Sequence, residues 1–176
     1  MMRNLAFVLF SLAAACTLVA EDPVKFTVGD CEFTRPADWT WVQPTSLMRK
    51  AQLEIAGKEG GKPADVTFFF FGSGQGGGVQ ANVQRWLGQF TGKPDANKVE
   101  PQEFNGVKVT LVSAEGTMKA SPFGAPTEDQ PDSALLGAIL EQPDGGVFVK
   151  MTGPAALVKE SREKFIAMVK AATAKK

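Results

Sequence analysis

An apolar run at Val66–Phe71, with the sequence VTFFFF, limits the fold of this chain more than any other segment. It follows a polar, glycine-rich turn at Lys58–Pro63 and precedes a seven-residue stretch, residues 72–78, in which five residues are glycine. A segment of this length between two turns is typical of a strand. Because its side chains are apolar on both faces, we expect a central strand of a sheet that is covered on both sides.

The segments around this strand alternate between strand and helix patterns. Val79–Phe90 carries an apolar stripe at helical spacing and ends before Gly92. Asn105-Gly106 is the strongest short hairpin signal in the chain. The other expected elements are short strands at Phe26–Val28 and Cys31–Phe33, a strand at Met48–Ile55, a hairpin of Lys98–Phe104 with Val107–Ser113, a surface loop at Lys119–Ser133, a second hairpin of Ala134–Glu141 with Gly146–Thr152, and a terminal helix at Pro154–Ala172. In that helix, Pro154 suits the first helical position.

No repeat or linker divides the chain after its N-terminal segment. We therefore predict a single α+β domain at residues 21–176, in which an antiparallel sheet lies in an α/β/α sandwich. The two helices supply the outer layers.

Residues 1–20 have the pattern of a signal peptide. A short positive region at Met1–Arg3 precedes the apolar run Leu5–Ala15, which is too short to cross a bilayer as a helix. Cleavage after Ala20 fits the small residues there, and it leaves Cys31 as the one remaining cysteine. The alternative is a lipoprotein box ending at Cys16, which would carry a lipid anchor. Either route predicts an exported protein, periplasmic or extracellular, with no transmembrane span.

Composition excludes several classes of function. The chain has no histidine and no tyrosine, so Ser-His-Asp catalysis, Cys-His catalysis and His-ligated zinc are excluded. Its 19 basic residues balance 19 acidic ones, which is unlike a nucleic-acid-binding protein. The chain carries no metal or cofactor motif, and we expect no cofactor.

The glycine-rich loop is the first candidate binding site. It comprises Gly74, Gln75, Gly76, Gly77 and Gly78 and leads into the expected helix, where backbone N–H groups favour anions. Its spacing matches neither a Walker loop nor a dinucleotide-binding fingerprint. We expect the loop either to bind an anion or to close over a partner, with a permissive connector as the alternative.

Three further side chains are candidates. Arg85 lies near the apolar stripe of the helix, where it could reach the loop or a bound anion, or simply face water. Trp39 and Trp41 share one face of an extended segment, and could form an aromatic platform for a sugar or peptide. Core packing of both rings is the alternative.

The order of these elements resembles the PsbP fold, including the Pro-x-x-Trp element at Pro36–Trp39. The resemblance covers most of residues 24–172. The run at Gly74–Phe90, with the pattern GQGGG-x-x-x-N-x-x-RW, also resembles a group of uncharacterised exported bacterial proteins, which implies no activity. The PsbP resemblance implies a binding or assembly subunit rather than an enzyme.

We therefore predict a non-catalytic exported binding or assembly module of the bacterial cell envelope. Its partner would be an envelope protein or a small anionic ligand. The alternatives are a histidine-independent envelope hydrolase that uses carboxylate or lysine groups, and a structural lipoprotein tethered through Cys16. A lysine or carboxylate of shifted pKa in a cleft would favour the hydrolase.

Overall fold

The computed structural model describes residues 22, 24–121 and 126–174. The predicted signal peptide at residues 1–20, its cleavage site and Cys16 lie outside these residues.

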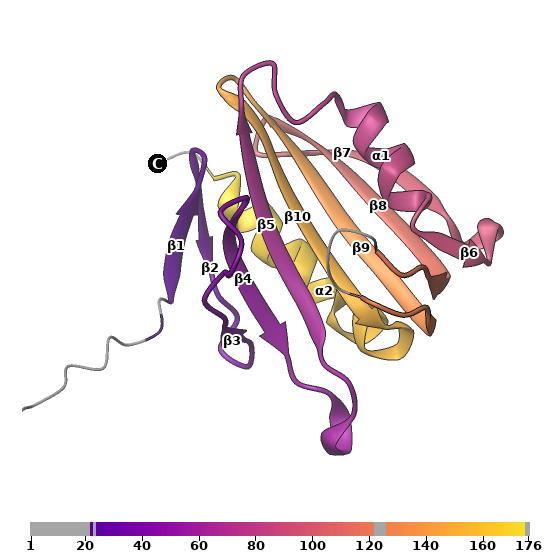
Figure 1. Cartoon of the computed structure of the whole chain (residues 1–176). Coiled ribbons are helices and arrows are strands. Elements are labelled where there is room, and N and C mark those ends of the chain that lie inside the picture. The colour runs from indigo at the N-terminus through magenta and orange to yellow at the C-terminus, as the bar shows by residue number, and fades with distance from the viewer. Residues whose placement is uncertain (1–21, 23, 122–125, 175–176) are drawn as a thin grey trace, which may run out of the picture.

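An antiparallel sheet of eight strands forms the centre of the molecule (Figure 1). Its order is β3 (Thr40–Trp41), β4 (Arg49–Ile55), β5 (Ala64–Gly72), β10 (Gly145–Pro154), β9 (Gln130–Gln142), β8 (Val107–Met118) and β6 (Phe90–Gly92), with β7 (Lys98–Phe104) also paired to β8. A separate hairpin consists of β1 (Lys25–Val28) and β2 (Cys31–Thr34), and two single-turn helices lie at Lys58–Gly60 and Pro94–Ala96.

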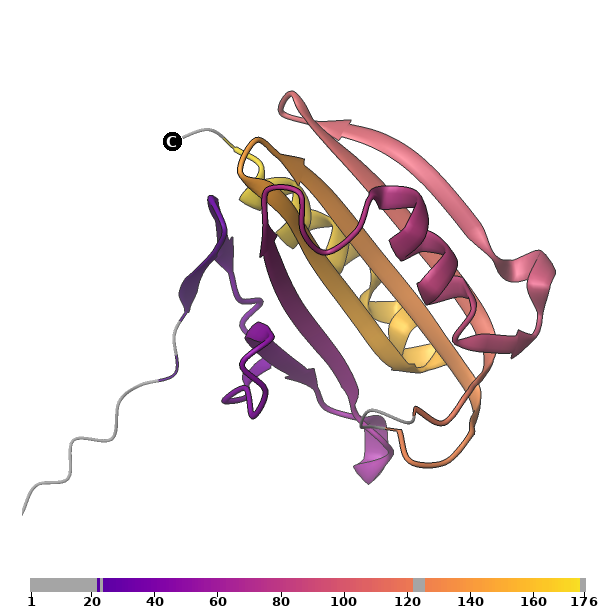
Figure 2. The same ribbon diagram turned by 45° about the horizontal axis from the view of Figure 1, so that its top comes forward.

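The two helices cover opposite faces of the sheet (Figures 1 and 2). The long helix α2 (Ala155–Ala172) and the β1–β2 hairpin pack on one face, in the larger apolar core. The shorter helix α1 (Val79–Leu87) packs on the other face, in a smaller core. The fold is therefore α+β with helices on both faces of an antiparallel sheet, as the sequence predicts. Among the described residues, no helix has the length and apolar character needed to cross a membrane.

Strand β5 shows why the run of phenylalanines needs two covered faces. Phe68 is fully buried in the core beneath α2, where its ring meets the rings of Phe26 and Phe33 edge-on at 5.0 Å. Phe69 and Phe71 point to the opposite face and pack against the smaller core beneath α1. Both faces of this strand carry apolar contacts, which confirms the expectation.

The two predicted hairpins are present. Asn105 and Gly106 both have positive φ, 52° and 82°, as the expected two-residue turn between β7 and β8 requires. In the second hairpin, β9 and β10 pair from Gly145 with Gln142 to Pro154 with Ser133.

Several element boundaries differ from the prediction, and strand β8, for example, continues past Ser113 to Met118. Helix α1 ends at Leu87, and Phe90 instead begins the short strand β6 opposite Met118. Strand β9 begins at Gln130, inside the segment expected to be a loop, because it pairs there with the end of β8. Pro154 precedes α2 in an extended conformation and is its N-cap rather than its first residue.

Candidate functional site

Helix α1 covers only part of its face of the sheet. The ring of Trp86 lies directly over Gly137 of β9, so closely that a Cβ at Gly137 would be 2.2 Å from Cζ3 of the ring. Trp86 also meets Phe148 edge-on, with 6.5 Å between ring centroids. Over β4, β5 and the adjoining half of β10, the same face forms a cavity of about 780 Å³, which we call the sheet-face cavity.

A row of polar side chains crosses the floor of the sheet-face cavity. Gln52 of β4 pairs with Thr67 of β5, and Thr67 pairs with Lys150 of β10, so the three residues share a face. All three line the cavity. Gln52 also donates a hydrogen bond from Nε2 to Oδ1 of Asp65, 3.0 Å away.

Lys150 is a cation without a carboxylate partner. Its Nζ donates to Oε1 of Gln89, a neutral amide oxygen 3.3 Å away in the segment that follows α1. No ion pair within the described part of the chain includes Lys150, Arg49 or Arg85. An ammonium group in this position is therefore held in place but not neutralised.

The two arginines near Lys150 are held in the same way. Arg49 donates from Nη1 to Oε1 of Gln52 at 2.7 Å, and Arg85 donates from Nη2 to Oδ1 of Asn82. Each of the three cations thus meets a side-chain amide oxygen, which orients it and leaves its charge intact.

The surroundings lower the pKa of Lys150 to about 8. Burial is the main cause, because it disfavours the charged form, and the positive charges of Arg49 and Arg85 act in the same direction. The carboxylate of Asp65 opposes them more weakly. The cavity therefore holds a lysine whose charge is costly and depends on pH near neutrality.

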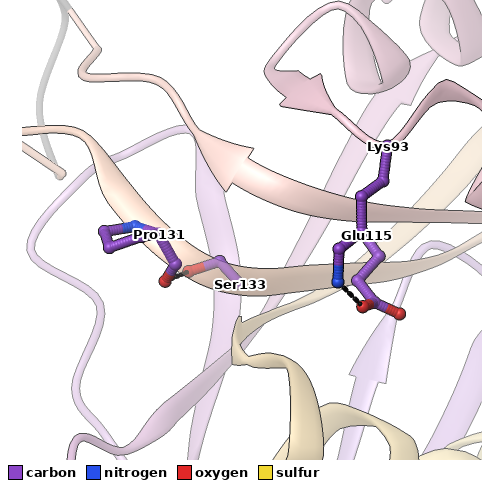
Figure 3. Close-up of polar contacts among 4 residues, drawn as sticks. All are labelled: Lys93, Glu115, Pro131 and Ser133. Atoms are coloured by element: carbon purple, nitrogen blue, oxygen red, sulfur yellow. Dashed lines mark hydrogen bonds and ion pairs between the residues drawn. The ribbon is translucent and has the colours of Figure 1, made fainter.

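The cavity extends to the start of β9, where Figure 3 shows Pro131 and Ser133. Pro131 and Ser133 line the cavity there, and the Ser133 hydroxyl donates to the Pro131 carbonyl at 3.3 Å. The same view shows Lys93 and Glu115, whose Nζ and Oε1 are 2.5 Å apart (Figure 3). This contact raises the pKa of Lys93 and lowers that of Glu115. Lys93 has the carboxylate partner that Lys150 lacks.

The glycine-rich loop is tied to α1 by a single side chain. Asn82 is fully buried, and its Nδ2 donates to the carbonyl oxygens of Gly76, Gly77 and Gly78 at 2.9, 3.3 and 3.0 Å. Gly76 and Gly77 both have φ of +77°, a conformation that other residues rarely adopt.

These contacts favour a structural role for the loop. Its carbonyl oxygens point to Asn82, and the adjoining cavity of about 330 Å³ has Glu141 but no lysine or arginine in its lining, which disfavours an anion. Arg85 lies exposed and orients Asn82, which in turn holds the loop. Binding by Gly74–Gly78 stays a prediction.

The geometry also explains the residues of the GQGGG-x-x-x-N-x-x-RW pattern. The glycines allow the turn, Asn82 fastens it, Arg85 orients Asn82, and Trp86 packs on Gly137. The pattern describes how α1 is attached to the sheet.

The prediction that Trp39 and Trp41 form an exposed aromatic platform is wrong. The side chain of Trp39 is 1% exposed, so no ligand can stack on it. Trp41 packs against the same core, where its ring meets that of Phe26 edge-on at 5.3 Å. The segment is not extended as expected, because Trp39 closes a turn in which its N–H donates to the Pro36 carbonyl at 3.0 Å, and only Thr40–Trp41 form a strand. Trp39 is thereby buried in the core that α2 and the β1–β2 hairpin cover, and Trp41 is half-buried against it.

Cys31 is also a core residue. Burial raises the pKa of its thiol to about 11, and Nε2 of Gln142 lies 3.4 Å from the sulfur. In the described ranges, no cluster of three metal-ligating side chains occurs.

Sequence reasoning missed Arg49, Gln52 and Lys150 as site residues. A signal for Lys150 was present, since a lysine in the apolar strand segment VFVKM shares a face with Phe148 and is expected to be at least partly buried beside it. Arg49 gave no such signal, because its place beside Lys150 depends on how β4, β5 and β10 pair.

No known protein family and no curated protein sequence matches this chain. Its fold is similar to those of several solved structures, including the following two. One is cyanobacterial PsbP (CyanoP) from Synechocystis sp. PCC 6803, with a TM-score of 0.55 and 8% identity over 90% of this chain and 96% of that one. The other is PA94 of Pseudomonas aeruginosa, a protein of unknown function, with a TM-score of 0.50 and 12% identity over 86% of this chain and 96% of that one. The PsbP-like fold is thereby confirmed.

Proposed function

We propose that the protein is a non-catalytic binding or assembly module of the bacterial cell envelope, and that it binds through the sheet-face cavity. The single observation that carries this proposal is the row of polar and charged side chains from three neighbouring strands, Gln52, Thr67 and Lys150, that floors this open cavity of about 780 Å³. The α2 face also has a cavity, of about 730 Å³, but it lies between the β1–β2 hairpin and the end of α2 and has no lysine or arginine in its lining. A cavity of this size with a few convergent polar groups is typical of a binding site.

The fold similarity supports the same function class. One similar structure is named a cyanobacterial PsbP. The resemblance of this chain to PsbP-type proteins implies a binding or assembly subunit rather than an enzyme. Export rests on the signal-peptide pattern at residues 1–20.

Site-specific photocrosslinking in the native envelope tests the proposal. A photoreactive residue at Thr152 lies in the lining of the cavity, and one at Glu163 lies on the exposed side of α2, as a matched control. We expect one discrete, saturable adduct from Thr152 and none from Glu163. Equal adducts from both positions, or none from either, would contradict binding through this face.

A histidine-independent hydrolase is the second candidate, and Lys150 is the observation that favours it. A lysine with a pKa of about 8 in a cavity has the properties of a general base. However, the nearby hydroxyl of Thr67 donates to the backbone carbonyl of Lys150, so it is not held as a nucleophile by the side-chain amine. Turnover of an envelope polymer that is lost in Lys150→Gln would establish the hydrolase.

A further inference from the structure

The three unpaired cations around the sheet-face cavity come from three different elements. Arg49 comes from β4, Lys150 from β10 and Arg85 from α1. Lys150 and Arg49 line the cavity, and both arginines are close enough to lower the pKa of Lys150. Because like charges repel, folding alone gives no reason to gather them here.

Neutral amides hold these cations where carboxylates would ordinarily neutralise them. Gln89, Gln52 and Asn82 each accept a hydrogen bond from one cation, as described above. Two carboxylates line the cavity: Asp65, which acts on Lys150 but already accepts a hydrogen bond from Gln52, and Asp132 of β9. A partly buried ammonium group without a carboxylate partner costs the fold stability, and a bound anion would supply the missing counter-charge.

We propose that the sheet-face cavity binds an oxyanion, a carboxylate or phosphate group of a small ligand, between Lys150 and Arg49, with Arg85 at the edge. Arg49 presents a planar donor fork to the anion, and Lys150 supplies a point charge from the cavity floor. This inference deepens the proposed function and rests on it, since it names the ligand class of the same cavity. It also moves the expected anion from the glycine-rich loop to the adjacent sheet face.

The pH dependence of binding follows from the groups that face Lys150. These are Arg49 from β4, Asp65 from β5 and Arg85 from α1, and the cavity lining adds Lys62, before β5, and Asp132 of β9. Among them the pKa of Lys150 is lowered to about 8. Below pH 8 the ammonium form predominates and attracts the anion. Above pH 8 the amine form is neutral, so binding weakens as the pH rises.

Amide chemical shifts of the full-length protein test the inference, with inorganic phosphate and succinate as probes. We expect saturable shifts at Thr67, Phe69 and Thr152 with at least one probe. Lys150→Gln should weaken that binding about tenfold or more, since hydrogen bonds to charged groups are the strong ones. Lys108→Gln, on the exposed surface of β8, is the matched control and should bind as the wild type does. Succinate stays doubly charged from pH 7 to 9.5, and over that range its binding should weaken about tenfold.

Three results would overturn the inference: no saturation with either probe, equal binding by the two variants, or shifts confined to Gly74–Gly78. The two experiments distinguish failure of the proposed ligand class from failure of the proposed binding function. If Thr152 still crosslinks a partner while neither probe binds, the binding function stands and the ligand class is wrong. If neither experiment gives a specific result, the proposed function fails as well.

Discussion

Gly137→Ala tests whether the contact between Trp86 and the sheet fixes the position of α1. The new Cβ would lie 2.2 Å from Cζ3 and 2.6 Å from Cε3 of the Trp86 ring. Both distances are far below a van der Waals contact. The indole cannot swing away freely, because it is 5% exposed and packs against Phe148 on its other side. Helix α1 must therefore move outward.

Overpacking of this kind costs about 1–3 kcal/mol. For a chain of this size, such a loss lowers the melting temperature by roughly 2–4 °C for each kcal/mol. The matched control is Gly72→Ala on β5, where an added Cβ would meet nothing within 4 Å. That variant should gain about 0.4–1 kcal/mol, because alanine restricts the unfolded chain.

Urea unfolding followed by tryptophan fluorescence measures both variants, and a double mutant identifies the cause. Trp86→Phe shortens the ring at the point of collision. In the Gly137→Ala background it should therefore cost less than it does alone, with a coupling of about 1 kcal/mol. If Gly137→Ala and Gly72→Ala have the same free energy of unfolding within about 0.5 kcal/mol, the close contact does not exist as described.

Three further predictions concern Asn82, Lys150 and Cys31. Asn82→Ala removes the donor to three loop carbonyls. It should lower the free energy of unfolding by about 1–2 kcal/mol and speed proteolysis within the loop. Gln80→Ala, on the exposed side of α1, is the control and should change neither. Lys150→Met should stabilise the protein at pH 7 by about 3 kcal/mol at most, because the folded-state pKa of about 8 lies below the ordinary lysine value of 10.5. Urea unfolding should show this gain shrinking from pH 8 to 10.5, where the unfolded lysine still holds the proton that the folded one has lost. A gain independent of pH would contradict the lowered pKa. Cys31 should react with iodoacetamide at pH 8 only after unfolding, because its side chain is 1% exposed and the pKa of its thiol is about 11. Fast labelling of the native protein would refute its burial.

Local sequence patterns predicted most of the fold. The phenylalanine run required two covered faces, and Asn105-Gly106 set a hairpin because both residues tolerate positive φ. The end of α1 was missed because Phe90 continues the helical stripe in sequence, yet pairs with Met118 from a strand far along the chain. Local periodicity cannot report a pairing of that kind.

The candidate site was less predictable. The glycine-rich loop stood out by composition, but its contacts show a turn fastened by Asn82, a residue that composition does not single out. The sheet-face cavity depends on the register that places Gln52, Thr67 and Lys150 in one row. Trp39 and Trp41 could have faced either water or the core, and the β1–β2 hairpin decides it, since Phe26 of that hairpin packs on Trp41.

A substitution at Gly77 would be a poor probe of binding. Its φ of +77° strains any branched side chain, so Gly77→Val would change folding of the loop before it changed any contact with a ligand. Lys150→Gln separates the two effects, because removing a buried charge does not disturb the backbone.

The pKa of Lys150 in the ligand-free protein tests the central claim most directly. Titration of its Cε resonance, assigned by comparison with Lys150→Met, should give a pKa of about 8 that rises when phosphate or succinate is added. A value near 10.5 that neither anion changes would mean that Lys150 is solvated or already paired, and it would contradict an anion site on this face of the sheet.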